Sequence, residues 1–508
     1  MTEQPDYEVA VIGAGPGGIA AGVTLQRNGI TDFVILERAD DVGGSWRDNT
    51  YPGLAVDIPA TSYQFSFARN PHWSRLFPDG DEIHAYLQDV ARRFGLYRHL
   101  QVCVDVQREI WDPDNGFWTL HTVCGGTITA RFVISAIGGY INPKQDIGIA
   151  GLDDFGGTII RPAAWDHDYN YTGKRVAVIG TGASSVQIVP ALSAHVQRLD
   201  VYQRTPVWCF PKPDMDFGPT AHRVLAVPGV AAAANAALLG ALEIVLDIVS
   251  YVPARLVIAA MPAFDAAMRT LYRRYLRATV TDRVTREALQ PAYGALSKRP
   301  TFCTGYPRAY NNPSTHLITT PIERLTTTGI RTTDGTHREI DMVVLATGYE
   351  LFSDPETYRP DTVVGRDGFD LGKYYSEHGL QAYHSVAIPG APNRWMLIGP
   401  YSWSGTAWHS IVEMTSHHAV RAITETRRRG AHIAEVRPQA HDAWHAGIIQ
   451  RGKAIQHYLV ERNADARTYY VNSHGESPYI RPQSIIKSLW QARHFPLDDY
   501  NYRHADVL

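Results

Sequence analysis

The 508-residue sequence predicts an α/β fold made of two similar units, each opening with a β-strand, a glycine turn and a helix. The first observation is an internal repeat, because residues 9–18 (VAVIGAGPGG) are similar to residues 176–185 (VAVIGTGASS). The second is that strand-like runs ending in glycine, residues 132–138 and 342–348, follow each repeat. We therefore expect the chain to leave a first domain, build a second one and return.

The first repeat has the spacing GxGxxG at Gly13, Gly15 and Gly18. In a Rossmann unit these glycines permit a tight turn, let the backbone approach a pyrophosphate and let the helix pack closely on the strand. Glu37 stands nineteen residues after Gly18, at the end of the strand-like run 33–36, where a carboxylate can accept hydrogen bonds from ribose hydroxyls. The set predicts a dinucleotide site, and a plain tight turn is the alternative.

The second repeat keeps Gly180 and Gly182 but has Ser185 in place of the third glycine. Nineteen residues later stands Arg204, whose guanidinium can bind a ribose 2′-phosphate through two hydrogen bonds. A solvated surface arginine is the alternative. Since Glu37 would repel a 2′-phosphate and Arg204 would bind one, the first site suits FAD and the second suits NADPH. A chain with both sites is built to pass a hydride from nicotinamide to flavin.

The segment between the repeats and the closing strands gives the domain organisation. Residues 214–295 are rich in Ala, Leu, Val and Arg without strand alternation, which predicts a helical insertion in the second unit. The expected parts, in order, are residues 1–150 (FAD-binding domain, first part), 151–213 (linker and NADP-binding domain, first part), 214–295 (helical insertion), 296–338 (NADP-binding domain, second part) and 339–508 (FAD-binding domain, second part, and C-terminal tail).

Composition excludes several classes of protein. Lys and Arg number 48 against 51 Asp and Glu, so the formal net charge is -3 and nothing predicts a nucleic-acid partner. The four cysteines lie at least twenty positions apart, which leaves no CxxC redox pair, no zinc spacing and no disulfide framework. The first residues lack the pattern of a signal peptide, and we expect a cytoplasmic protein with no metal site.

Residues 224–264 are unusually apolar. A membrane-spanning helix needs about 20 uninterrupted apolar residues, whereas Asn235, Glu243, Asp247, Arg255 and three prolines interrupt this stretch. We expect no stable membrane insertion, and favour buried helices or an apolar lid near a substrate entrance. Weak interfacial contact with a membrane stays open.

Two longer segments resemble the flavin-dependent Baeyer-Villiger monooxygenases. Residues 43–46 (GGSW), 51–53 (YPG) and Asp57 are similar to that family's GGTW, YPG and D stretch. Residues 155–166 are similar to its fingerprint FxGxxxHxxxW, followed by Pro or Asp. Further matches in chain order are residues 203–206 (QRTP), 298–300 (KRP), 346–348 (ATG), 399–400 (GP) and, in the tail, 469–470 (YY) and 498–500 (DDY).

The sequence departs from the family pattern in the fingerprint, where Arg161 replaces the histidine. In the family this histidine lies in the linker between the two domains, so the coupling of flavin reduction to oxygenation is in question. His167 could take its place only if the loop shifts. Tyr469 stands where many members have a tryptophan that contacts nicotinamide, and Ser185 has replaced a glycine. The resemblance therefore implies an atypical member.

The resemblance implies an NADPH- and O2-dependent FAD monooxygenase that inserts one oxygen next to a ketone carbonyl, through a flavin C4a-peroxide, to give an ester or lactone. It assigns Arg299 as the cation that stabilises the negative charge, with Asp57 as its partner. An ordinary ion pair is the alternative. Lys298 would share the 2′-phosphate with Arg204. The further cofactor-binding residues that it implies are Gly44, Trp46, Val106, Ser184, Thr205 and Gly399.

Two other functions stay open at this point. One is an N- or S-oxygenating flavin monooxygenase, and the other is an uncoupled NADPH oxidase or a flavoprotein that does not oxygenate. Trp165, Asp166 and Arg299 favour the ketone reaction, whereas Arg161 keeps the uncoupled oxidase in consideration. The expected partners are molecular oxygen and a small hydrophobic substrate, with a ketone preferred.

Overall fold

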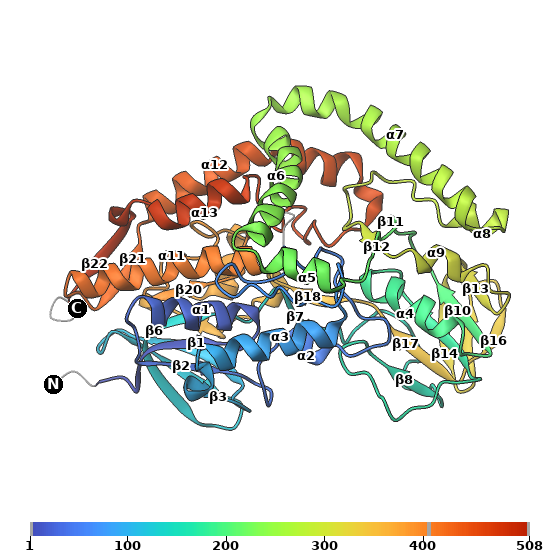
Figure 1. The fold of residues 1–508 in the computed structure, drawn as a ribbon. Helices are drawn as coiled ribbons and strands as arrows, with labels where there is room; N and C mark the ends of the chain where they lie inside the picture. The colour runs from blue at the N-terminus through green and yellow to red at the C-terminus, as the bar shows by residue number, and fades with distance from the viewer. Residues whose placement is uncertain (1–3, 404–407, 505–508) are drawn as a thin grey trace.

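The computed structural model describes residues 4–403 and 408–504, and two sheets form the cores of two units (Figure 1). In the first sheet the strand order is β19-β4-β5-β6-β1-β2-β3, and β20 also pairs with β6. These strands are β1 (Tyr7–Ile12), β2 (Phe33–Leu36), β3 (Leu100–Gln101), β4 (Val106–Asp112), β5 (Phe117–Thr122), β6 (Thr127–Ser135), β19 (Val363–Val364) and β20 (Arg394–Met396).

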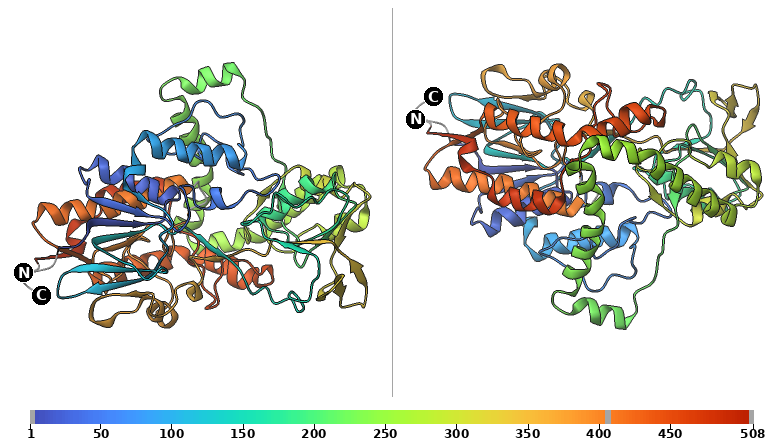
Figure 2. Two further views of the ribbon diagram at one scale, coloured as in Figure 1. Left: turned by 90° about the horizontal axis from the view of Figure 1, so that it is seen from below. Right: turned by 90° about the horizontal axis from the view of Figure 1, so that it is seen from above.

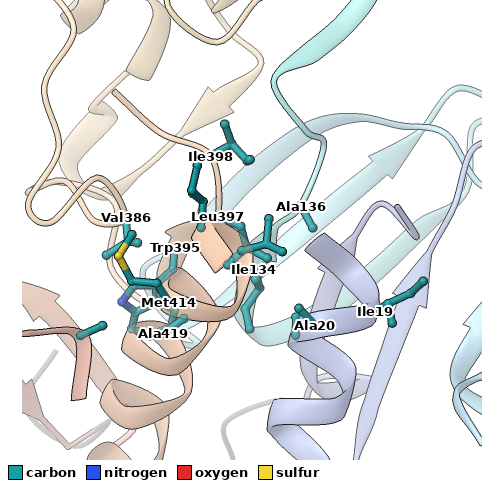
Figure 3. Close-up of a cluster of buried hydrophobic side chains, with 14 of the residues drawn as sticks. Ile19, Ala20, Ile134, Ala136, Val386, Trp395, Leu397, Ile398, Met414 and Ala419 are labelled. Carbon is teal, nitrogen blue, oxygen red and sulfur yellow. The ribbon is translucent and has the colours of Figure 1, made fainter. Parts of the chain in front are cut away.

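The centre of the first sheet is parallel and buried. β1 lies between β2 and β6 and pairs in parallel with both. Helix α1 (Pro16–Arg27) follows β1 and packs against α11 (Trp408–Arg428), which comes from the far end of the chain. Figure 3 shows how Ala20, Ile134, Trp395 and Met414, each no more than 1% exposed, lie in this core. The C-terminal part of the chain thus completes the first unit.

The second sheet is parallel, with the order β13-β10-β9-β17-β8. Its strands are β8 (Thr158–Ile160), β9 (Arg175–Ile179), β10 (Arg198–Tyr202), β13 (Thr315–Ile318) and β17 (Met342–Leu345). The boundary expected at residue 339 is wrong, because β17 pairs with β8 and β9 and so belongs to the second unit. Helix α4 (Ala183–Ser193) follows β9 as α1 follows β1.

Two neighbouring strands link the units. β7 (Tyr140–Pro143) carries the chain out of the first unit, and β18 (Tyr349–Leu351) brings it back. The two strands pair in an antiparallel ribbon, with Tyr349 opposite Pro143 and Leu351 opposite Tyr140. Because both crossings lie side by side, side chains on this ribbon stand between the two sheets.

Residues 214–295 contain the helices α5 (Pro219–Ala226), α6 (Val230–Tyr251), α7 (Ala254–Thr279) and α8 (Arg283–Ala288). Helix α12 (Pro438–Gln456) packs against both α6 and α7, and α13 (Ile485–His494) packs against α11. Figure 1 shows α6, α7, α12 and α13 together on the upper side of the molecule, and the right view of Figure 2 looks down on them. We call these four helices the helical cap.

A buried ion pair fixes the middle of the first unit. Arg394 of β20 donates from Nε and Nη2 to the two carboxylate oxygens of Glu109 in β4, at 2.7 and 2.8 Å. The side chains are 5% and 9% exposed. Each charge therefore depends on the other, since removing one partner leaves the second buried without compensation.

We predict that Glu109→Ala lowers the free energy of unfolding by about 3–5 kcal/mol, because it leaves the Arg394 guanidinium buried and unpaired. Urea denaturation followed by circular dichroism measures the loss. Arg331→Ala is the control, since Arg331 makes an equally close two-bonded pair with Glu323 but both side chains are over 40% exposed. That variant should lose no more than about 1 kcal/mol. Equal losses in the two variants would contradict the assignment.

Candidate cofactor and active site

The first glycine turn has the backbone geometry that its residues predict. Gly13 has a φ of +102°, and a Cβ atom there would lie 2.7 Å from the carbonyl oxygen of Ala136. A Cβ atom on Gly18 would lie 1.9 Å from the oxygen of Gly13. Gly15 precedes α1, and no side chain caps the helix. The first-turn N–H groups of α1 are thus left for an anion such as a pyrophosphate.

The segment 43–46 lies against this turn. Gly44 has a φ of +55°, and a Cβ atom there would stand 3.0 Å from the Cα atom of Gly15. Trp46 follows on the short helix α2 (Ser45–Asp48), and its Nε1 donates to the hydroxyl of Tyr63 at 3.0 Å. The structure therefore brings the predicted residues Gly44 and Trp46 to the first turn.

Glu37 is buried directly after β2, where the spacing places it. Its Oε2 accepts a hydrogen bond from the backbone N–H of Ala14 at 2.7 Å, and its Oε1 accepts one from Ala39 at 3.0 Å. Arg47 lies 3.4 Å from the same carboxylate. The carboxylate is thus fixed beside the glycine turn.

Val106 and Gly399 occupy other places in the first unit. Val106 begins β4, two residues after Val104, whose N–H donates to the carbonyl oxygen of Glu37 at 2.9 Å. A Cβ atom on Gly399 would lie 2.3 Å from the oxygen of Ser385, so the turn requires glycine. The segment with Val106 therefore borders Glu37, and Gly399 marks a close approach of two backbones.

The second turn repeats this geometry without its third glycine. Gly180 has a φ of +113°, and a Cβ atom there would lie 2.4 Å from the oxygen of Ala346. Gly182 precedes α4 without a side-chain cap, and a Cβ atom there would meet nothing within 4 Å. Ser185 is buried in the place of the missing glycine. The open space at Gly182 and the uncapped helix suit a second pyrophosphate.

Three cations gather beyond the second turn. Arg204 is exposed just after β10, and the carbonyl oxygen of its neighbour Thr205 accepts from the hydroxyl of Thr181 at 2.8 Å. Burial, together with the charges of Arg204 and Arg467, lowers the pKa of Lys298 to about 8. Such a cluster is costly by itself and is stabilised by an anion. Arg204 and Lys298 were predicted from the sequence, whereas Arg467 was not, because it lies in no recognised pattern.

The C-terminal segment reaches this cluster through specific contacts. Asn463 accepts from the backbone N–H of Gly294 at 2.7 Å, and the hydroxyl of Tyr458 accepts from Leu296 at 3.3 Å. Ala466 is fully buried in the core of the second unit. These contacts dock the segment before Arg467 onto the loop before Lys298.

Arg299 and Asp57 meet between the two units. The Nη2 atom of Arg299 lies 2.8 and 2.6 Å from the two carboxylate oxygens of Asp57, and Nη1 donates to the hydroxyl of Tyr140 at 3.2 Å. The side chains of Arg299 and Asp57 are 29% and 16% exposed. The charge of Asp57 holds the pKa of Arg299 well above its usual range, so the guanidinium keeps its proton.

Tyrosines line the surroundings of this ion pair. The ring centroid of Tyr469 lies 4.9 Å from that of Tyr470 and 5.3 Å from that of Tyr479. The hydroxyls of Tyr479 and Tyr140 are 3.4 Å apart. Burial raises the pKa values of Tyr469, Tyr470 and Tyr479, which keeps these phenols neutral. Tyr140 and Tyr479 were missed because neither belongs to a motif.

The loop that holds Asp57 is anchored on α4. The hydroxyl of Tyr51 donates to Gln187 at 2.9 Å and also faces the side chain of Ser184. Gln187 donates in turn to the carbonyl oxygen of Ala55 at 2.7 Å. Gly53 has a φ of +82°, and a Cβ atom there would lie 2.8 Å from the oxygen of Gln187. The loop of the first unit is thereby tied to the second glycine turn.

The fingerprint segment also connects the units. A Cβ atom on Gly157 would lie 2.5 Å from the ring of Phe155, and both Phe155 and Trp165 are buried. The Nε atom of Arg161 is buried without a hydrogen-bond partner among the described residues. His167 Nε2 lies 2.8 Å from the hydroxyl of Thr50, in the first unit. The imidazole next to the fingerprint thus makes an interdomain contact.

These features define a two-dinucleotide oxidoreductase with a partly buried cation where its two units meet. Residues 10–225 match the family model described as "Pyridine nucleotide-disulphide oxidoreductase". The chain is 35% identical to a Baeyer-Villiger monooxygenase of Streptomyces coelicolor, over 97% of this chain and 92% of the relative. A Baeyer-Villiger monooxygenase of Pseudomonas aeruginosa is 34% identical, over 85% of this chain and 79% of that protein.

Comparison with solved structures agrees with the comparison of sequences. An oxidised steroid monooxygenase bound to NADP is 27% identical, with a TM-score of 0.82 over 98% of this chain and 99% of that one. The chain belongs to the Baeyer-Villiger monooxygenase family. The resemblance on which the sequence analysis relied is thereby confirmed.

We predict that Arg467→Ala raises the pKa of Lys298 toward its ordinary value, because it removes one of the two cations that lower it. The measurement is a pH titration of the lysine signals by nuclear magnetic resonance, with Lys298→Arg identifying the signal. Arg331→Ala, which removes an exposed arginine from another sheet, should leave the titration unchanged. An unaltered pKa in Arg467→Ala would remove Arg467 from the cluster.

Proposed function

We propose that this chain acts in the cytoplasm as an NADPH- and O2-dependent FAD monooxygenase, which inserts one oxygen next to the carbonyl of a small ketone to give an ester or lactone. The observation that carries the proposal is the Arg299–Asp57 pair, which joins the two units. Relatives named as Baeyer-Villiger monooxygenases over nearly the whole chain support it.

The residues present fit both cofactors. Each of α1 and α4 begins at an uncapped glycine, Gly15 or Gly182, and so offers free N–H groups to a pyrophosphate. Glu37 stands where the ribose of FAD would lie, with Gly44 and Trp46 beside the first turn. Bound FAD, reduced by NADPH, supplies the activation of O2.

Arg204, Lys298 and Arg467 would hold the 2′-phosphate of NADPH. The phosphate would neutralise three cations that otherwise repel one another, and Lys298 would regain the proton affinity that they lower. NADH lacks this phosphate and would leave the three charges unpaired. The cluster therefore favours NADPH over NADH.

Arg299 would stabilise negative charge that develops on oxygen near the carbonyl of the substrate. Asp57 holds the guanidinium by two contacts to one nitrogen, and Tyr140 binds the other nitrogen. Tyr469, Tyr470 and Tyr479 form an aromatic wall that would limit the access of water to this charge. Exclusion of water strengthens the interaction between the cation and the developing oxyanion.

We predict that Arg299→Ala keeps FAD but lowers ester formation by a factor on the order of a hundred or more, because one oxyanion contact of this kind is worth about 3 kcal/mol. Arg299→Lys should restore little activity, since the point charge of an ammonium group does not reproduce the planar guanidinium and its paired donors. Mass spectrometry of the products measures the reaction, and visible flavin absorbance confirms cofactor loading. Ester formation at the parent rate would show that the cation lies elsewhere.

We predict that Arg204→Ala and Arg467→Ala each weaken binding of 2′,5′-ADP about tenfold or more, because each removes a charged hydrogen-bond donor. Binding of 5′-ADP, which lacks the 2′-phosphate, should change little. Isothermal titration calorimetry measures the affinity for both ligands. The Michaelis constant for NADPH should likewise rise more than that for NADH. An equal loss of affinity for both ligands would indicate a general disturbance of the domain.

A further inference from the structure

The exposed apolar side chains of this protein gather on the helical cap. Among the described residues, 20 large apolar side chains are exposed. Eleven of them lie in the cap and its α6–α7 connection, which are residues 230–279, 438–456 and 485–494. These ranges hold only 79 of the 508 residues. A monomeric protein seldom exposes so large an apolar area on one side unless that side binds something.

Helix α7 is apolar on two opposite faces. Val257, Met261 and Leu276 face inward and are buried. On the outer face, Leu256, Phe264 and Leu271 recur at helical spacing and are 57%, 43% and 57% exposed. The exposed positions between them are mostly alanines, at 259, 260, 263 and 267. The outer face of α7 is therefore an apolar stripe that no other described part of the chain covers.

Neighbouring helices of the cap also expose large apolar side chains. Ile244, Val245 and Ile248 of α6 are 50–60% exposed, and Ile486 and Trp490 of α13 are 59% and 61% exposed. The Nζ atom of Lys487 donates to the hydroxyl of Tyr251 at 3.0 Å, which brings α13 next to the end of α6. The right view of Figure 2 shows α6, α7, α12 and α13 on the same face of the molecule. The cap therefore exposes both aliphatic side chains and a tryptophan.

The charge of the cap is opposite to that of the rest of the chain. The residues of the cap include nine Lys or Arg and four Asp or Glu, which gives a formal charge of +5. The whole chain carries -3, so the remainder carries -8. Two of the four acids, Glu243 and Asp265, are only 2% and 1% exposed. The surface that faces outward is thus apolar and basic, with few exposed carboxylates.

We propose that the helical cap binds the surface of an anionic lipid bilayer, with α7 lying in the interface and its arginines near the lipid phosphates. Exposed apolar side chains on one face, basic residues around them and an exposed tryptophan are the features of such interfacial helices. A second copy of the chain is a poorer occupant, because a symmetric dimer would bring one +5 surface against another.

The cap lies on the bilayer rather than crossing it. Helix α6 has the length and apolar character of a membrane span, with 22 residues and a mean hydropathy of 1.8 over an 18-residue window. However, its Glu243 carboxylate accepts from the backbone N–H of Ile485, and α6 packs against α12. Insertion across a bilayer would break these contacts and expose the carboxylate to hydrocarbon. The proposal concerns surface binding and is independent of the reaction proposed above.

The test is flotation of the purified FAD-loaded protein with two kinds of vesicle, phosphatidylcholine alone and phosphatidylcholine mixed with phosphatidylglycerol. The protein should float with the anionic vesicles and much less with the neutral ones. The triple variant Leu256→Asp, Phe264→Asp, Leu271→Asp should bind at least about tenfold more weakly. Val123→Asp is the matched control, because Val123 is 60% exposed in the turn between β5 and β6, outside the cap.

A second variant keeps the proposal testable if the triple aspartate variant does not fold. Arg273→Glu with Arg274→Glu leaves the apolar stripe intact and should weaken binding to anionic vesicles by about tenfold or more, with no loss on neutral ones. Equal flotation of parent and variants, or no preference of the parent for anionic vesicles, would overturn the proposal. A dimer in light scattering that the triple aspartate variant abolishes, without vesicle binding by the parent, would assign the stripe to a second copy instead.

Discussion

The ion pair between Arg299 and Asp57 is the interaction on which the arrangement of the site depends. Asp57 belongs to the first unit and Arg299 to the second, and the guanidinium holds both carboxylate oxygens through one nitrogen. A charge that is partly removed from water needs a partner at this distance. This contact is thus one of those that join the two units, and it holds the cation that we propose for the reaction.

Separate parts of the fold bring each partner to this contact. Tyr51, Gln187 and Ala55 tie the loop of Asp57 to α4, beside the second glycine turn. Asn463 and Tyr458 dock the C-terminal segment onto the loop that leads to Arg299. Because the same segment continues to Arg467 and Tyr469, one docking event places a cation at the proposed 2′-phosphate site and an aromatic wall at the ion pair.

Much of the fold could be predicted from the sequence, because its signals are local. The spacing of Gly13, Gly15 and Gly18 follows from backbone geometry, and the structure shows the positive φ and the close contacts that require glycine. The end of the second unit could not be predicted in this way. Residues 342–345 are a buried apolar run that suits either sheet, and only the pairing with β8 and β9 assigns them.

The residues of the candidate site also differ in whether the sequence alone could predict them. Arg299 and Asp57 were assigned by resemblance to the family, since no spacing rule relates residues 242 positions apart. Arg467 and Tyr479 carry no local pattern. Arg467 follows Ala466, which is buried in the core of the second unit, whereas Tyr479 packs in the core of the first unit. Such residues follow from tertiary packing, which a sequence motif does not encode.

The reaction itself is the insertion of one oxygen next to the carbonyl of a ketone, with Arg299, held by Asp57, as the proposed cation. Mass spectrometry of the products from a panel of ketones, sulfides and amines, with NADPH consumption and hydrogen peroxide followed in parallel, tests it most directly. The account predicts a gain of one oxygen on ketones, with NADPH consumption that rises when the ketone is present. Oxygenation of sulfides and amines alone, or NADPH consumed with hydrogen peroxide as the sole product, would contradict it.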